Sequence, residues 1–135
     1  MAARDRIAEL RALPLFAEVS DASIERIAAI ATELDVPAGQ VLVQRNECGS
    51  GMYVVLEGAV SVELRGKTVE LGPGEFFGEL SLLVPGATRG ARVRASGAAR
   101  CLAIGHGEFA EVLDSDHPLA LAMLGTLAAR MRDML

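Results

Sequence analysis

The 135 residues are enough for one domain that buries its own core, and about half of them (51%) are hydrophobic. The formal charge of −5, from 13 basic and 18 acidic residues, argues against nucleic acid as a partner, because phosphate backbones require clustered positive charge. No apolar run approaches the roughly 20 residues that span a bilayer, and the charged N-terminus does not resemble a signal peptide, so we expect a cytoplasmic protein without a membrane segment.

The first part of the chain is predicted to be helical. A short helix is expected over residues 4–11, and Pro14 ends it with an apolar turn at residues 13–16. Ser20 and Asp21 are typical helix-start residues. The apolar residues that then recur at helical spacing are Ile24, Ile27, Ala28, Ala31 and Leu34. We therefore expect N-terminal helices over residues 1–34.

From Val36 onward the pattern changes to short alternating runs separated by turns. Strands are expected at residues 40–44, 52–56, 60–65, 68–71, 91–95 and 98–104. Strands this short, with a turn every eight to twelve residues, are typical of an antiparallel sandwich or jelly roll. The predicted fold class is α+β, a single domain over residues 1–135 with a β-roll at residues 35–105.

The end of the chain is predicted to be helical over residues 106–135. One short helix is expected at residues 108–113, and Asp116 and Pro118 mark the start of a longer one to Leu135, about 27 Å long. Its candidate seam consists of Ala120, Leu124, Leu127, Met131 and Met134. Since this helix is apolar on more than one face, we expect one face to pack on the domain and another to meet a ligand or a partner.

The stretch from Gly72 to Ala95 carries the most specific chemistry. Glu79 follows Gly78 directly before an apolar helical turn, and Arg89 stands ten residues later beside Gly90. A helix start exposes backbone N–H groups that attract anions, and a glycine lets a ligand approach the main chain. A carboxylate accepts hydrogen bonds from hydroxyls, and an arginine offers a planar fork to a phosphate. The pattern indicates a small ligand with hydroxyls at one end and a compact anion at the other.

The segment from Phe77 to Leu83, followed by Arg89-Gly90-Ala91, resembles the phosphate-binding cassette of the cyclic nucleotide-binding domain family. Its Glu79-to-Arg89 spacing is similar to that of the bacterial branch that includes the catabolite activator protein. The resemblance implies an α–β-roll–α fold with a C-terminal helical lid. It also implies that Glu79 holds the ribose 2′-hydroxyl and that Arg89 holds the cyclic phosphate.

The resemblance predicts a cyclic nucleotide sensor, with cyclic AMP or cyclic GMP as ligand, no catalytic residues and no cofactor. The ligand-binding candidates within the cassette, residues 77–91, are Phe77, Gly78, Glu79, Leu80, Ser81, Arg89, Gly90 and Ala91. The candidate lid contacts are Leu124, Leu127 and Arg130, where Arg130 would stack on the purine. Gly90 lacks the hydroxyl that cyclic-GMP-selective relatives offer to guanine, which favours cyclic AMP.

Two other classes of function stay open at this point. A degenerate module could keep the fold for dimerisation, or bind a larger effector protein, through the last helix. A cupin-like enzyme would require clustered metal ligands, but Cys48 and Cys101 form no Cys-x-x-Cys pair and His106 and His117 are isolated. We interpret the cysteines as thiols in a reducing compartment and the histidines as helix-start residues. We also expect no helix-turn-helix DNA reader after the last helix, so that the chain is either a free-standing sensor or a regulatory part of a longer protein.

Overall fold

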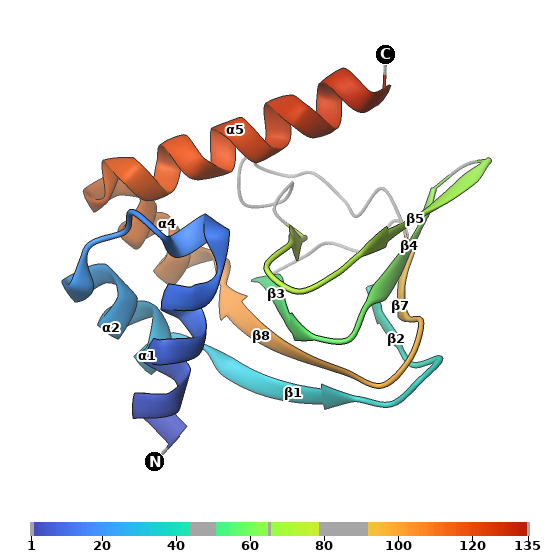
Figure 1. The fold of residues 1–135 in the computed structure, drawn as a ribbon, viewed down its shortest axis with the longest axis horizontal. Coiled ribbons are helices and arrows are strands. Elements are labelled where there is room, and N and C mark those ends of the chain that lie inside the picture. The colour runs from blue at the N-terminus through green and yellow to red at the C-terminus, as the bar shows by residue number, and fades with distance from the viewer. Residues whose placement is uncertain (1, 44–50, 65, 79–91, 135) are drawn as a thin grey trace. The chain divides into compact units, whose positions relative to one another are not determined.

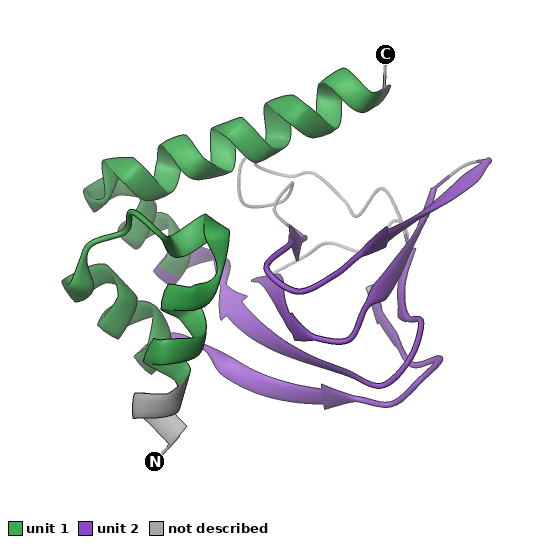
Figure 2. Ribbon diagram, viewed as in Figure 1, with its two compact units in different colours: residues 1–29, 109–135 green, residues 30–108 purple. Residues whose placement is uncertain are grey.

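The computed structural model describes residues 2–43, 51–64, 66–78 and 92–134 (Figure 1). The helices are α1 (Ala2–Ala12), the 3₁₀ turn η1 (Pro14–Phe16), α2 (Asp21–Ile30), α4 (His106–Ser115) and α5 (His117–Met134). The strands are β1 (Thr32–Val36), β2 (Val41–Val43), β3 (Gly51–Glu57), β4 (Val60–Leu64), β5 (Lys67–Leu71), β6 (Phe76–Phe77), β7 (Arg92–Ala95) and β8 (Ala99–Gly105). The chain divides into a helical unit, residues 1–29 and 109–135, and a strand unit, residues 30–108 (Figure 2).

The strand unit is a roll of two four-stranded antiparallel sheets. One sheet has the order β1-β8-β3-β6 and the other the order β2-β7-β4-β5. Both sheets contribute to one buried cluster, formed by Val36, Val55, Val60, Leu71, Phe77, Val93, Ala95, Ala99 and Cys101. In β7, Val93 and Ala95 alternate with the half-buried Arg92 and Arg94, and in β8, Ala99 and Cys101 lie on the same face, as the pleat of a strand requires. The predicted α+β fold with an antiparallel β-roll is confirmed.

The boundary between the N-terminal helices and the roll is a correction to the prediction from sequence. The helix expected through Leu34 ends at Ile30, and Thr32–Val36 forms β1. β1 pairs with β8 over its whole length, and Leu34 lies opposite Cys101 and packs on the buried cluster. The apolar spacing at Ala31 and Leu34 therefore continues the helical pattern only by coincidence, because pairing with a distant strand decides the local conformation.

The helical unit buries apolar side chains from every one of its helices. They include Leu10, Leu15, Phe16, Ile24, Ile27, Phe109, Val112, Leu119 and Met123. Arg11 fixes the turn after α1, where its guanidinium donates hydrogen bonds to the carbonyls of Phe16 at 3.0 Å and Val19 at 2.6 Å. Among the described residues, no helix is long and apolar enough to cross a membrane.

The long helix α5 has apolar residues on two faces, as the sequence predicts. Leu119 and Met123 are buried, whereas Leu124 and Met131 are 61% and 66% exposed. Ala120 and Leu127 of the candidate seam are half-buried. The seam is therefore not the buried stripe of α5, because each residue turns the helix by about 100°, which carries Leu124 away from the face of Met123.

One buried carboxylate joins the starts of two helices in the helical unit. Asp116 Oδ1 accepts the Leu119 N–H at 3.1 Å and so caps α5. Its Oδ2 accepts the Ser20 N–H at 3.2 Å and the Ser20 hydroxyl at 2.9 Å, while Ser20 Oγ caps α2 by accepting the Ser23 N–H at 3.2 Å. Burial raises the pKa of Asp116, but the hydrogen bonds from Ser23, Leu119 and Ser20 outweigh burial and hold it below its usual value.

Asp116→Ala is expected to lower the free energy of unfolding by about 1–3 kcal/mol, because a helix cap and a buried acceptor are lost together. A carboxylate whose pKa is lowered on folding stabilises the protein at neutral pH, and that contribution disappears as the pH falls through the lowered pKa. The difference between wild type and Asp116→Ala should therefore shrink in acid. Urea unfolding at several pH values measures it, with the exposed Asp114→Ala as matched control. A difference that grew in acid would contradict the assignment.

Candidate functional site

The approach to the predicted cassette is a short strand held against β3. In β6, Phe76 pairs with Val54 and Phe77 with Tyr53. The turn before it is closed by Glu75, whose side chain accepts the Gly72 N–H at 2.8 Å. The Glu75 carbonyl in turn accepts the Val55 N–H at 2.9 Å. Glu75 is exposed, and its side chain also closes this turn.

Phe77, the first residue of the cassette, is fixed from the side by an aromatic partner. It is buried, and its ring stacks on that of Tyr53 with 4.9 Å between the ring centroids and 16° between the planes. Such a pair contributes roughly 0.5–1.5 kcal/mol beyond the area that it buries. Phe77 belongs to the buried cluster of the roll and Tyr53 packs against it, so the start of the cassette is anchored to the core.

Gly78, the second residue of the cassette, adopts a conformation suited to glycine. Its φ of +86° lies in the left-handed region, where a Cβ would meet the following carbonyl. Its carbonyl oxygen lies 3.3 Å from Nε2 of His106, the first residue of α4. The sequence pattern predicts Gly78 as part of the cassette and His106 at a helix start, but it does not predict the contact between the two residues.

The other cassette candidates, Glu79, Leu80, Ser81, Arg89, Gly90 and Ala91, lie outside the described residues. The three candidate lid residues belong to α5 in the helical unit, where Leu124 is exposed and Leu127 and Arg130 are half-buried. Two described residues were missed by sequence reasoning, Tyr53 and His106. For Tyr53 the strand alternation was a signal, because Tyr53 lies between the buried Met52 and Val54 and therefore points to the opposite face of β3. None existed for His106, which lies 28 residues from Gly78.

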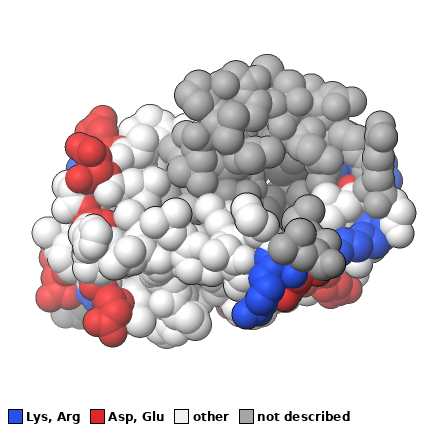
Figure 3. Space-filling model, turned by 90° about the horizontal axis from the view of Figure 1, so that it is seen from above, with Lys and Arg blue, Asp and Glu red and all other residues white. Residues whose placement is uncertain are grey.

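The arginines near the cassette are paired with acids on the surface of the roll. Arg92 lies 2.6 Å from Glu63, and Arg94 lies 3.6 Å from the same carboxylate. Arg100 lies 3.0 Å from Glu33 and also pairs with Glu57. On the face in Figure 3, the basic side chains of described residues lie next to acidic ones. These arginines therefore form no basic patch that would attract a polyanion.

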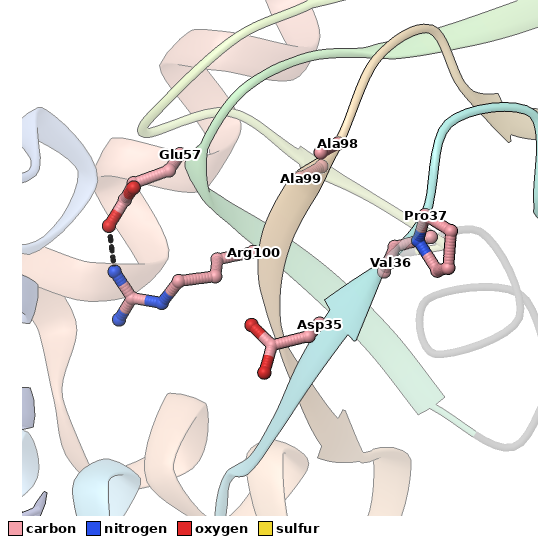
Figure 4. Close-up of a pocket in the computed structure, with 7 residues that line it drawn as sticks. All are labelled: Asp35, Val36, Pro37, Glu57, Ala98, Ala99 and Arg100. Atoms are coloured by element: carbon pink, nitrogen blue, oxygen red, sulfur yellow. Dashed lines mark hydrogen bonds and ion pairs between the residues drawn. The ribbon is translucent and has the colours of Figure 1, made fainter.

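A shallow pocket of about 340 Å³ lies beside Arg100, at the strand ends of the first sheet (Figure 4). Its lining residues are Asp35, Val36, Pro37, Glu57, Ala98, Ala99 and Arg100. Arg100 points toward Glu57, with which it pairs, and it also pairs with Glu33, so it is not a free cation for a phosphate. Of the predicted ligand-binding residues that the structure describes, neither Phe77 nor Gly78 lines the pocket.

The thiol of Cys101 is a core group. It is fully buried in the cluster of the roll, and burial raises its pKa to about 11. A thiol of that pKa is protonated and unreactive at neutral pH. Within the described part of the chain, no group of three or more histidine, cysteine, aspartate or glutamate side chains could hold a metal ion.

Comparison with known proteins agrees with this architecture. Residues 33–116 match the model of the cyclic nucleotide-binding domain family. A cyclic nucleotide-gated potassium channel of Mesorhizobium japonicum is 37% identical over 109 residues, which cover 81% of this chain and 30% of the channel. One of Rhizobium etli is 36% identical over 107 residues, covering 79% and 30%. This chain thus spans under a third of the length of these channels.

Among solved structures, one from work on a cyclic-GMP-dependent signalling pathway that regulates bacterial phytopathogenesis is 28% identical, with a TM-score of 0.71. The match covers 84% of this chain and 94% of that one. Since the family model matches more than half of the residues, the chain belongs to the cyclic nucleotide-binding domain family.

Gly78→Ala is expected to destabilise the protein by about 1–2 kcal/mol, because a Cβ is strained at a positive φ. Gly97→Ala is the matched control, since a Cβ added there meets nothing within 4 Å and its φ is not positive. Urea unfolding of the two variants measures the difference. If both unfolded at the same urea concentration, the conformation assigned to Gly78 would be wrong.

Proposed function

We propose that the chain is a regulatory sensor in the cytoplasm that binds a cyclic nucleotide and performs no catalysis. The observation that carries the proposal is the family match over residues 33–116, which contains the whole cassette, residues 77–91. The names of the potassium channels and of the phytopathogenesis pathway support the same class of ligand. We favour cyclic AMP over cyclic GMP, because Gly90 has no hydroxyl to offer to guanine.

The proposed division of labour follows from the chemistry of the ligand. A cyclic phosphate carries one negative charge, which the guanidinium of Arg89 can meet with two parallel hydrogen bonds. A ribose hydroxyl is neutral and donates, so the carboxylate of Glu79 suits it as acceptor. The remaining residues complete the site through their backbone amides and by letting the ligand come close to the main chain. They are Phe77, Gly78, Leu80, Ser81, Gly90 and Ala91.

We further propose that α5 is the element that reports whether the ligand is bound, with Leu124, Leu127 and Arg130 as its contacts. Support comes from the exposed apolar side chains of α5, since Leu121, Leu124 and Met131 are all more than half exposed. A ligand shifts such an equilibrium only by its difference in affinity for the two states; about 3 kcal/mol would change their ratio roughly a hundredfold. The same side chains would let α5 meet a second copy of the chain or a larger effector protein.

Arg89→Ala is expected to weaken the binding of cyclic AMP by about 1.5–3 kcal/mol, or roughly ten- to 150-fold in affinity, because a charge-assisted hydrogen bond to the phosphate is lost. Arg89→Lys should not fully restore affinity, since the planar fork is gone. Titration calorimetry with cyclic AMP and cyclic GMP measures both variants.

The matched control is Arg92→Ala, which removes a nearby arginine that is paired with Glu63 and should leave affinity unchanged. If both Arg89 variants bound as tightly as wild type, Arg89 would not be the phosphate anchor. Wild-type protein that bound neither nucleotide would favour the alternative, a degenerate module that serves dimerisation or protein interaction.

Hydrogen exchange over residues 117–135 is expected to slow or quicken when cyclic AMP is added at saturation, because ligand would change the position of α5. The helix α2 in the same unit provides the internal reference, and its exchange should stay the same. Samples at two protein concentrations separate an effect of ligand from one of self-association. Equal protection of α5 with and without ligand would mean that the helix is fixed.

A further inference from the structure

The contact between His106 and Gly78 lies at the first step of the cassette. Gly78 O is an acceptor, so the 3.3 Å contact with Nε2 is a hydrogen bond when that nitrogen carries the proton. The ring of His106 is half-buried, and the residue sits at the junction of β8 and α4. The position of His106 is therefore set by two elements, which hold its ring near Gly78.

Strand pairing explains why these two residues meet. β8 and β6 flank β3 on opposite sides, where Tyr53 pairs with both Ala103 and Phe77. The flanking strands are thus about 10 Å apart, twice the usual spacing between neighbouring strands. His106 directly follows β8 and Gly78 directly follows β6, and the His106 side chain, the 3.3 Å contact and the Gly78 carbonyl together bridge this separation.

A hydrogen bond that fixes the Gly78 carbonyl also fixes the amide group that comes after it. A peptide unit is planar, so the direction of a carbonyl oxygen determines the direction of the next amide N–H. Gly78 needs such a restraint more than other residues, because glycine has the largest range of backbone conformations. The stack of Phe77 on Tyr53 holds the chain one residue earlier but does not restrain this peptide.

We propose that His106 is a positioning residue for the cyclic nucleotide site, which acts by donating a hydrogen bond from Nε2 to the Gly78 carbonyl. This inference rests on the proposed function. His106 touches no ligand in this role; it orients the peptide from which Glu79 and the rest of the cassette continue. The site would thereby depend on a side chain 28 residues away from Gly78 in the sequence.

Two amide substitutions separate this role from a general structural one. In His106→Gln the side-chain NH₂ can take the place of Nε2. In His106→Asn the side chain is shorter, so its NH₂ takes the place of Nδ1 and does not reach the Gly78 carbonyl. Both amides are neutral, and asparagine suits a helix start at least as well as glutamine does. We expect His106→Asn to lower the affinity for cyclic AMP about three- to tenfold, as for one lost hydrogen bond. The affinity of His106→Gln should stay within about twofold of wild type.

The experiment combines titration calorimetry with cyclic AMP, urea unfolding and ¹⁵N NMR of the imidazole nitrogens. The control is His117→Asn, at the start of α5, which should leave affinity unchanged. We expect a protonated Nε2 in the ligand-free protein and equal unfolding midpoints for the two amide variants. The inference is overturned if His106→Asn binds cyclic AMP as tightly as wild type, or if His106→Gln loses as much affinity as His106→Asn. It is also overturned if Nε2 of His106 is unprotonated.

The NMR measurement needs no ligand, so it separates the two claims. Wild-type protein that has a protonated Nε2 but binds neither cyclic AMP nor cyclic GMP would overturn the proposed function. Protein that binds cyclic AMP while Nε2 is unprotonated would overturn only the role of His106.

Discussion

The antiparallel pairing of β3 with β8 is the constraint on which the described part of the site depends. These two strands lie at the centre of the first sheet, and each is paired on both sides. Met52, Val54, Leu102 and Ile104 are buried on one face of the pair, while Val55 and Cys101 belong to the core cluster on the other. The close approach of the two strands at Gly51 also favours this register. A Cβ on Gly51 would come within 2.8 Å of the Ile104 carbonyl oxygen, so a residue with a side chain does not fit there. A slip of one residue would turn every one of these side chains to the wrong face. It would also move His106 away from Gly78, since one follows β8 and the other follows a strand that pairs only with β3 in this sheet.

The described arginines on the strands of the roll are paired with acidic side chains, which affects the electrostatic field of this surface. Arg92, Arg94 and Arg100 stand on strands, point away from the core and meet Glu63, Glu33 and Glu57. Ion pairs on a surface stabilise a fold by only about 0–1 kcal/mol each, so their energetic role is small. Their effect on binding is larger, because paired arginines do not add up to the positive field that draws a polyanion. A net charge of −5 works in the same direction. The anion site proposed above would therefore depend on local groups, the guanidinium of Arg89 and backbone amides, which suit a small ligand.

How far the sequence predicts this molecule depends on the range of the interactions involved. The helices with caps and the strands with alternating residues were predicted, because Ser20, Asp116 and the period-two runs act within a few residues. β1 was missed, because Thr32 to Val36 has no alternation strong enough to oppose the helical spacing that ends at Leu34, and only pairing with β8 makes it a strand. β6 has two residues, too few for any periodic signal. The cassette was recognised from its own residues, whereas Tyr53 and His106 reach it through the sheet. Local patterns therefore identify the groups proposed to touch a ligand, and long-range pairing determines which groups contact Phe77 and Gly78 at the start of the cassette.

The helix α5 is capped at its start and buries Leu119 and Met123 near that end, whereas Leu124 and Met131 are exposed. Asp116 caps its first turn, and both of its buried side chains, Leu119 and Met123, lie within its first two turns. Beyond them stands Gly125, at which an added Cβ would meet nothing within 4 Å. A glycine inside a helix costs roughly 0.5–1 kcal/mol relative to alanine, so the helix is weakest close to its middle. The exposed Leu124 directly precedes this glycine, and the exposed Met131 follows it by six residues. A ligand or a partner that engaged Leu124 and Met131, as proposed, would therefore meet the helix beyond the turns that the Asp116 cap and the buried Leu119 and Met123 hold in the helical unit.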